Sequence, residues 1–434
     1  MGIGDKGDAI LQNAIYGVLA PTYPSGIPSS SNPSSAQDDV LVVLLTEDSI
    51  RNLYDDGLIQ ANEWPIEYSD HANIISRLMK YEARSVFVDV YFKRKRSTDD
   101  TAERFINSLH HAQNRSGTKL WFAGGYKDED LSPWQEELKD NFGLTLNGWE
   151  GYGGAYPLYD DAQSSAAMDM YKEACLEEDS YQNCNNTFSS TMIDDGVSLP
   201  AVSVRWGARP AAAIFPEYTS EECNTFNWFD FVKQSPSMLF SEIESVGCPY
   251  SKVLYADDLV HIDKFGTEVE KARLSEAIKD KSILYGMYLE GLHDTVTSPV
   301  HGKLPGVMLH AMVLDNLITY GMDYQRATDE KAEQLSYIAW AFISFILAVI
   351  MWRLYGRDFY GKPTNLDSDE NIWKRKRAIQ WTHRVGMILV IIFSIYTFMI
   401  LQYEPYNAIG FLVLIGAVGF IEDLIAFLAK KLQL

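Results

Sequence analysis

The chain has 434 residues with 37 basic and 59 acidic side chains, which gives a formal charge of -22. Such a surface repels a polyanion, so we expect no nucleic-acid partner. Hydrophobic residues make up 47% of the chain, which excludes a mostly disordered protein, and 4 cysteines are too few for a disulfide scaffold.

The first 38 residues contain a short apolar stretch and a linker. Residues 9–20, AILQNAIYGVLA, are too few to span a membrane, and the acidic residues Asp5 and Asp8 precede them where an export signal has basic ones. Residues 21–37, PTYPSGIPSSSNPSSAQ, are a Pro/Ser linker. We therefore expect that an N-terminal span is missing or that the start is assigned downstream of the true one.

Residues 39–330 have the pattern of an α/β domain. Continuous apolar runs at 40–45 (VLVVLL), 84–92 and 119–123 predict buried strands, and the stretches 66–81 and 101–113 between them predict helices. This alternation predicts a mainly parallel sheet with right-handed crossovers. The pattern returns with a strand at 283–289 and a helix at 305–320, which has Pro at its start and Gly after its end.

The region 126–250 is less regular, and we interpret it as an insertion of loops and short helices that holds all four cysteines. An even number of cysteines in an oxidising compartment favours two disulfides, and the simplest of the three possible pairings joins Cys175 to Cys184 and Cys223 to Cys248. Buried free thiols are the alternative. The absence of a Cys-x-x-Cys pair argues against zinc.

Residues 331–434 are membrane-like, with apolar runs at about 335–355, 385–403 and 408–429. A bilayer core takes about 20 apolar residues in a helix, so these runs predict a C-terminal bundle of three transmembrane helices, with buried helices of a soluble protein as the alternative. Glu422 and Asp423 interrupt the third run, where they either extend toward the interface or pair with another helix.

The charges predict the orientation of these spans. The loop between the first two runs holds seven of the 11 basic residues in this region, including the segment WKRKR at 373–377. The positive-inside rule places that loop in the cytoplasm. We therefore expect a multi-pass protein of a bacterial inner membrane, in contact with the lipid bilayer, with residues 1 to about 330 outside the cytoplasm.

Three blocks of the chain resemble the type-2 CHASE domain, an extracytoplasmic sensory module of bacterial membrane receptors. They are VLVVLLTEDSI (40–50), EWPIEYSDHANIISRLMKYEARSVFVDVYF (63–92) and ILYGMYLEGLHDTVTSPVHGKLPGVMLHAMVLDNLI (283–318). The resemblance covers about 40–320 and implies sensing and anchoring. Members of the family often continue into a cyclase or kinase domain after the third span, and this chain stops at Leu434.

Candidate ligand-binding residues lie at strand ends and around a Pro-Gly loop. Asp89 interrupts an apolar strand, where an ionised group is unfavourable unless it is paired, and the end of a parallel strand lies near the usual ligand crevice. The resemblance also places an Asp there. We expect a ligand site from a set that includes Asp48, Asp89, His293, Asp294 and His310. The alternative is that these residues and His301 order turns by hydrogen bonds, and whether they hold a metal stays open.

Two hypotheses of function follow. In the first, the external domain senses a ligand or partner and passes its state through the spans to a separate protein. In the second, the chain is a non-enzymatic structural or assembly subunit of a larger cell-envelope or filament complex. We expect a partner protein or a homo-oligomer, formed through the transmembrane helices or the external domain. No catalytic motif and no cofactor-binding motif is found, so we do not expect an enzyme.

Overall fold

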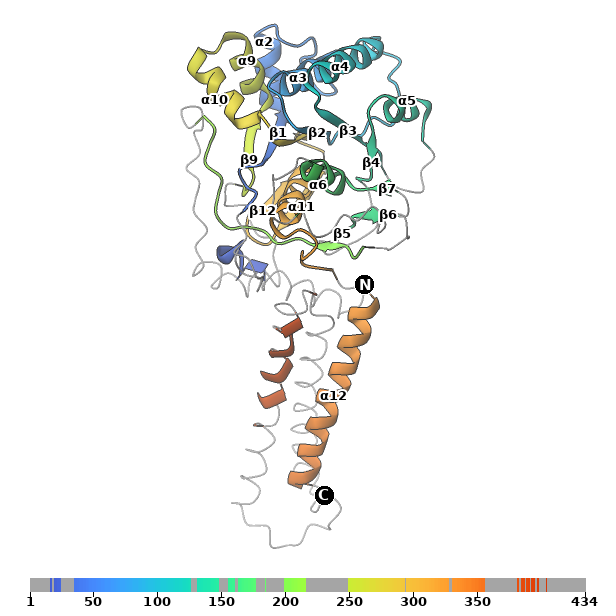
Figure 1. Ribbon diagram of the computed structural model, residues 1–434, viewed down its shortest axis with the longest axis vertical. Coiled ribbons are helices and arrows are strands. Elements are labelled where there is room, and N and C mark those ends of the chain that lie inside the picture. Colours follow the sequence, from blue (N-terminus) through green and yellow to red (C-terminus); the bar gives the residue numbers. More distant parts are fainter. Residues whose placement is uncertain are drawn as a thin grey trace, which may run out of the picture. The chain divides into compact units, whose positions relative to one another are not determined.

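The structure is a computed structural model (Figure 1). It describes residues 16–17, 19–24, 35–125, 131–147, 155–160, 163–176, 184, 199–215, 249–292, 294–327 and 330–355, with short stretches between 381 and 403. The chain divides into two compact units, Tyr16–Tyr324 and a second unit made of Met1–Ile15 and Gln325–Leu434. The first unit contains the α/β domain, and the second contains helix α12, Glu330–Tyr355.

A parallel sheet forms the centre of the first unit. Six strands among the described residues lie in the order β4–β3–β2–β10–β1–β9. Their bounds are Val40–Thr46 (β1), Ser85–Val88 (β2), Lys119–Ala123 (β3), Leu144–Thr145 (β4), Lys252–Tyr255 (β9) and Ser282–Tyr288 (β10). Every neighbouring pair is parallel, which confirms the predicted mainly parallel α/β sheet.

The helices that connect these strands cover one face of the sheet. The connections from β9 to β10, β1 to β2, β2 to β3 and β3 to β4 all step in the same direction across it. Because such crossovers are right-handed, their helices lie on the same face (Figure 1). These helices are α2 (Glu47–Asp55), α3 (Tyr68–Lys80), α4 (Ala102–Ser116), α5 (Pro133–Asn141), α9 (Ala256–Phe265) and α10 (Glu268–Ile278).

Two further helices cover the opposite face. They are α6 (Ala166–Leu176) and α11 (Val307–Tyr320), and they pack together on β1, β2 and β10 (Figure 1). A Cβ atom on Gly286 of β10 would lie 2.6 Å from Val307, so glycine lets the start of α11 approach the sheet closely.

Burial on both faces explains the continuous apolar run of the first strand. Leu41, Val43 and Leu45 belong to the core under the connecting helices, whereas Val42 and Leu44 belong to the core under α6 and α11. Side chains of a strand alternate between faces, so a strand covered on both sides needs apolar residues at every position.

The smaller strands form antiparallel pairs. The turn before α11 is the hairpin of β11 (Thr295–Ser298) and β12 (Gly302–Pro305). Within the predicted insertion, β5 (Ala155–Tyr156) pairs with β8 (Val202–Ser203), and β6 (Tyr159–Asp160) pairs with β7 (Gln163–Ser164). Cys175 and Cys184 form a disulfide with a Cα–Cα distance of 5.4 Å, which confirms that predicted pair. Cys223 and Cys248 lie outside the described residues.

The prediction of a C-terminal bundle of three transmembrane helices is wrong. Among the described residues, no helix is both long enough and apolar enough to cross a membrane. The physical reason is that an apolar run in the sequence is not sufficient, because a span also needs one continuous apolar helix. The run at 385–403 is described only in part, and the run at 408–429 lies outside the described residues together with Glu422 and Asp423.

Candidate ligand site at the carboxyl edge of the sheet

The candidate site lies where two neighbouring strands send the chain to opposite faces. After β2 the chain turns to α4 on one face, and after β10 it passes through the β11–β12 hairpin to α11 on the other. In open α/β sheets, ligands bind beyond the carboxyl ends of the strands at such a divergence. The adjacent ends of β2 and β10 are therefore the place to look for a site.

Asp89 directly follows β2 and is almost completely buried, with 9% of its surface exposed. Its backbone N–H donates to Tyr285 O at 2.8 Å, which fixes it beside β10. Asn147 Oδ1 accepts from Gly125 N at 2.7 Å, so its amide group is held in one orientation, and its side chain hydrogen-bonds to the Asp89 carboxyl group. Burial raises the pKa of Asp89 to about 6, against a smaller lowering by Asn147.

The side chain of His310, on α11, faces the carboxyl group of Asp89. Its Nε2 lies 3.9 Å from Asp89 Oδ1, and its Nδ1 lies 2.7 Å from the Tyr156 hydroxyl group. That hydroxyl also accepts from Ala167 N at 3.3 Å, which holds it beside the imidazole. Burial lowers the pKa of His310 to about 4, which makes it neutral at pH 7.

Asp294 is the exposed member of the group. Its carbonyl oxygen accepts from Gly306 N at 3.0 Å, and a Cβ on Gly306 would lie 2.2 Å from its Oδ1, so only glycine leaves room for this carboxylate. Partial burial and the nearby charge of Asp89 raise the pKa of Asp294 to about 6. The site therefore has one carboxyl group at the surface and one beneath it.

The other predicted site residues do not join this group. Asp48 lies in the first turn of α2, is largely exposed, and pairs with Arg51 at 3.1 Å. His301 is buried, and its Nε2 contacts Gly207 O at 2.8 Å, which ties the hairpin to the 199–215 segment. His293 lies outside the described residues.

Two members of the site were not predicted from the sequence. Tyr156 lies on β5 and Asn147 follows β4, both in the region interpreted as an irregular insertion. The aromatic and glycine-rich stretch WEGYGGAYPLYDD at 149–161 contains the tyrosine, but a tyrosine in such a stretch has no spacing that points to a histidine 154 positions away.

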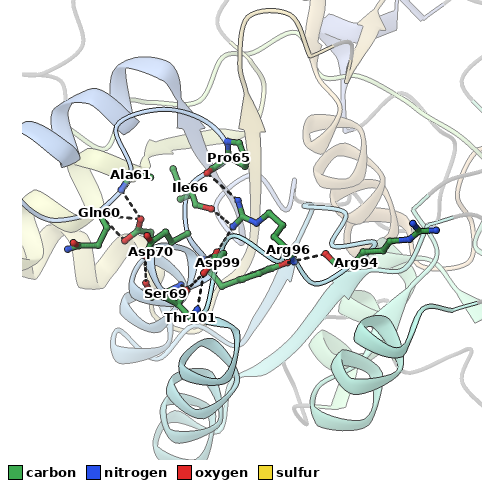
Figure 2. A network of polar contacts seen from close by, with 12 residues as sticks. Gln60, Ala61, Pro65, Ile66, Ser69, Asp70, Arg94, Arg96, Asp99 and Thr101 are labelled. Carbon is green, nitrogen blue, oxygen red and sulfur yellow. Dashed lines mark hydrogen bonds and ion pairs between the residues drawn. The ribbon is translucent and has the colours of Figure 1, made fainter.

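A second polar network holds the loop that follows Asp89 (Figure 2). Asp99 Oδ1 accepts from Thr101 N at 2.9 Å and from its hydroxyl at 2.6 Å, while Oδ2 accepts from Tyr68 N at 2.8 Å and Arg96 at 2.7 Å. Burial opposes ionisation of Asp99, but these donors together lower its pKa. The loop is thus fastened to the start of α3 by a fully paired carboxylate.

The geometry suits binding of a polar ligand more than it suits metal binding. Within the described residues, no group of three or more His, Cys, Asp and Glu side chains is placed to hold a metal ion. Asp89, Asp294 and His310 can exchange hydrogen bonds and protons with a polar molecule that is bound against them.

The fold and this site define a class: an α/β domain with a polar site at the carboxyl edge of its sheet. A family model described as the CHASE2 domain matches residues 10–352, which is more than half of the chain, so the protein belongs to the CHASE2 domain family. CHASE2 is an extracytoplasmic sensory domain family, as the resemblance implied. No curated protein and no solved structure matches the chain.

Proposed function

We propose that this protein senses a small polar molecule, which binds beyond the carboxyl ends of β2 and β10 against Asp89, Asp294 and His310. The observation that carries the proposal is the buried carboxyl group of Asp89, which among the described residues faces a neutral imidazole and an amide group and no cation. A buried carboxyl group without a cation is unfavourable, and a ligand that donates hydrogen bonds or carries a positive charge compensates it.

The extracytoplasmic placement belongs to the same proposal. It is supported by the sensory family and by the Cys175–Cys184 disulfide, because disulfides persist in oxidising compartments. In an alkylation assay without reductant, the two cysteines should be unreactive in protein isolated from cells. Free thiols at both positions would contradict the placement.

The ligand is best sought with a thermal-shift screen of the full chain against amines, amino acids, dicarboxylates and sugars at pH 7. We expect at least one class to raise the melting temperature, with the shift lost in Asp89→Asn and His310→Gln. Asp48→Asn is the matched control, since Asp48 is exposed and pairs with Arg51. A shift that survives in both site variants would place the ligand elsewhere, and no shift with any class would contradict binding.

A second candidate function, assembly with a partner protein or a second copy, has its own support in α12. Leu335, Ile338, Phe342, Phe345 and Val349 are exposed at intervals of three and four residues, which is the a/d spacing of a helix that pairs with another helix. Chemical cross-linking of the full chain tests this candidate. Phe342→Glu should abolish a cross-linked species, whereas Tyr337→Glu, at an exposed position outside the row, should not.

A further inference from the structure

A second buried polar cluster lies on the C-terminal half of α11 and is separate from the residues of the candidate ligand site. Asp315 is 1% exposed, and its Oδ1 accepts from the Thr319 hydroxyl at 3.3 Å and from the Tyr23 hydroxyl. Its Oδ2 is buried and has no hydrogen-bond partner among the described residues.

Tyr23 belongs to residues 19–24, which we call the N-terminal strap. This segment contacts the C-terminal half of α11. Asn316 Nδ2 donates to the Tyr23 hydroxyl at 3.2 Å, and the Tyr320 hydroxyl donates to Pro24 O at 2.7 Å. Ala208 N also donates to Ala20 O at 3.2 Å. The strap is thus held on α11 by side-chain hydrogen bonds, of which the Tyr23–Asp315 contact is central.

The charged groups around Asp315 do not neutralise a carboxylate. The guanidinium group of Arg205 is 2% exposed, but its Nη1 bonds to the Tyr320 hydroxyl at 3.1 Å and its plane lies over the rings of Tyr23 and Tyr320. Among the described residues, the other titratable neighbours are Tyr250, whose hydroxyl faces Ser35 and Asp315, and Asp39, which repels Asp315 and pairs with Lys281 at 3.0 Å.

Ionisation of Asp315 therefore works against the closed strap. Burial raises the pKa of Asp315 to about 7, and the hydroxyl groups around it lower it only in part. The closed form keeps the proton up to that pH, whereas an opened, hydrated form releases it near pH 4. Because the closed form binds more protons, its stability relative to the open form falls as the pH rises from about 4 to 7.

From this geometry we infer that the N-terminal strap is a proton-controlled latch: with Asp315 neutral the strap lies closed on α11, and with Asp315 ionised it opens. α11 ends at Tyr320, and the first unit ends at Tyr324, so the latch acts on the segment through which the chain leaves the sensory unit. The inference goes beyond the proposed ligand site and does not depend on it.

Hydrogen exchange of the full chain without added ligand tests the latch. The backbone amide of Ala208 reports on strap opening, since it lies outside the strap and donates to Ala20 O. Relative to Asp315→Asn at the same pH, we expect wild-type protection of this amide to fall about tenfold or more between pH 5.5 and 8, because one pKa unit is a tenfold change in an equilibrium. Comparison at equal pH cancels the chemical pH dependence of exchange.

Two further variants complete the design. Tyr23→Phe removes the donor and should lower strap protection at both pH values, while Asp70→Asn, at a buried carboxyl group bonded to Gln60 and Ala61, should change nothing at the strap. If Asp315→Asn does not fold, the ratio of strap to β1 protection within the wild type gives the same measurement. Equal strap protection in wild type and Asp315→Asn at every pH, or a wild-type ratio that does not change with pH, would overturn the latch. Loss of ligand binding in Asp89→Asn with an intact latch would separate the two proposals.

Discussion

Asp89 and Asp99 follow the same strand, lie ten positions apart and are both about nine-tenths buried, but their carboxyl groups are held in different ways. Asp99 has Arg96 and donors from Thr101 and Tyr68, and its pKa is lowered. Asp89 has one amide group and a neutral imidazole, and its pKa is raised to about 6.

The difference separates a residue that maintains the fold from one that is available to a ligand. A carboxylate with charge-assisted hydrogen bonds on both oxygens fixes its surroundings. A buried carboxyl group without a cation has a shifted pKa, which is common at functional sites although structural networks also produce it. Variants at the two positions should therefore differ in the sign of their effect on stability.

The largest effect is expected for Asp99→Ala, which should lower the free energy of unfolding by about 3 kcal/mol, as is typical when one partner of a buried ion pair is removed. The Tyr68 N–H would lose its acceptor, and Arg96 would lose the carboxylate with which it pairs. Urea unfolding at pH 7 measures this change. A loss below about 1 kcal/mol would show that the network in Figure 2 is not needed to hold the loop.

A change of opposite sign is expected for Asp89→Asn. The folded protein keeps the Asp89 proton up to about pH 6, whereas an unfolded chain releases it near pH 4, so the buried carboxyl group lowers stability as the pH rises through this window. The variant should be more stable than the wild type by about 2 kcal/mol at pH 8, and the gain should vanish at pH 4. An equal effect at both pH values would mean that Asp89 is not titrating in this range.

His310→Gln should reveal a pH dependence of stability that is opposite in sign to that of Asp89. The folded protein resists protonation of His310 until about pH 4, whereas an unfolded chain takes up the proton near pH 6.5, so this group lowers stability as the pH falls. The wild type should lose about 1 kcal/mol more than the variant between pH 7.5 and 5.5. The loss of packing in the variant is present at both pH values, so parallel unfolding curves for the two proteins would contradict a buried neutral His310.

Much of the fold is predictable from the sequence because its signals are local. The apolar run at 40–45 and the helical stripe at 66–81 correspond to β1 and α3, and the helix predicted at 305–320 begins two residues later, at Val307. The edge strand β9 and helices α9 and α10 were not predicted. β9 is an edge strand with one side open. It begins at Lys252 and ends at Tyr255, so it lacks the continuous apolar pattern of β1.

The candidate site is predictable only where one residue carries its own signal. Asp89 stands out as a charge inside an apolar strand, and Asp294 and His310 lie close to each other in the chain. Tyr156 and Asn147 come from short strands in a region without periodicity, and a hydrogen bond that joins positions 156 and 310 depends on tertiary packing. The apolar runs after residue 330 led to a wrong prediction. Their length alone predicted transmembrane helices, and the described helices do not form them.

The smallest effect is expected for Asp48→Ala, and it sharpens the contrast with Asp89. Both acids come just after the apolar part of a strand, so sequence patterns do not tell them apart, but Asp48 is exposed in the first turn of α2 and pairs with Arg51 three positions later. Exposed ion pairs contribute little, so the variant should change the free energy of unfolding by less than about 0.5 kcal/mol at pH 4 and pH 8 alike. Urea unfolding at the two pH values provides the measurement. A pH-dependent change like that at Asp89 would mean that the carboxyl ends of β1 and β2 belong to one site, and that exposure does not separate the two acids.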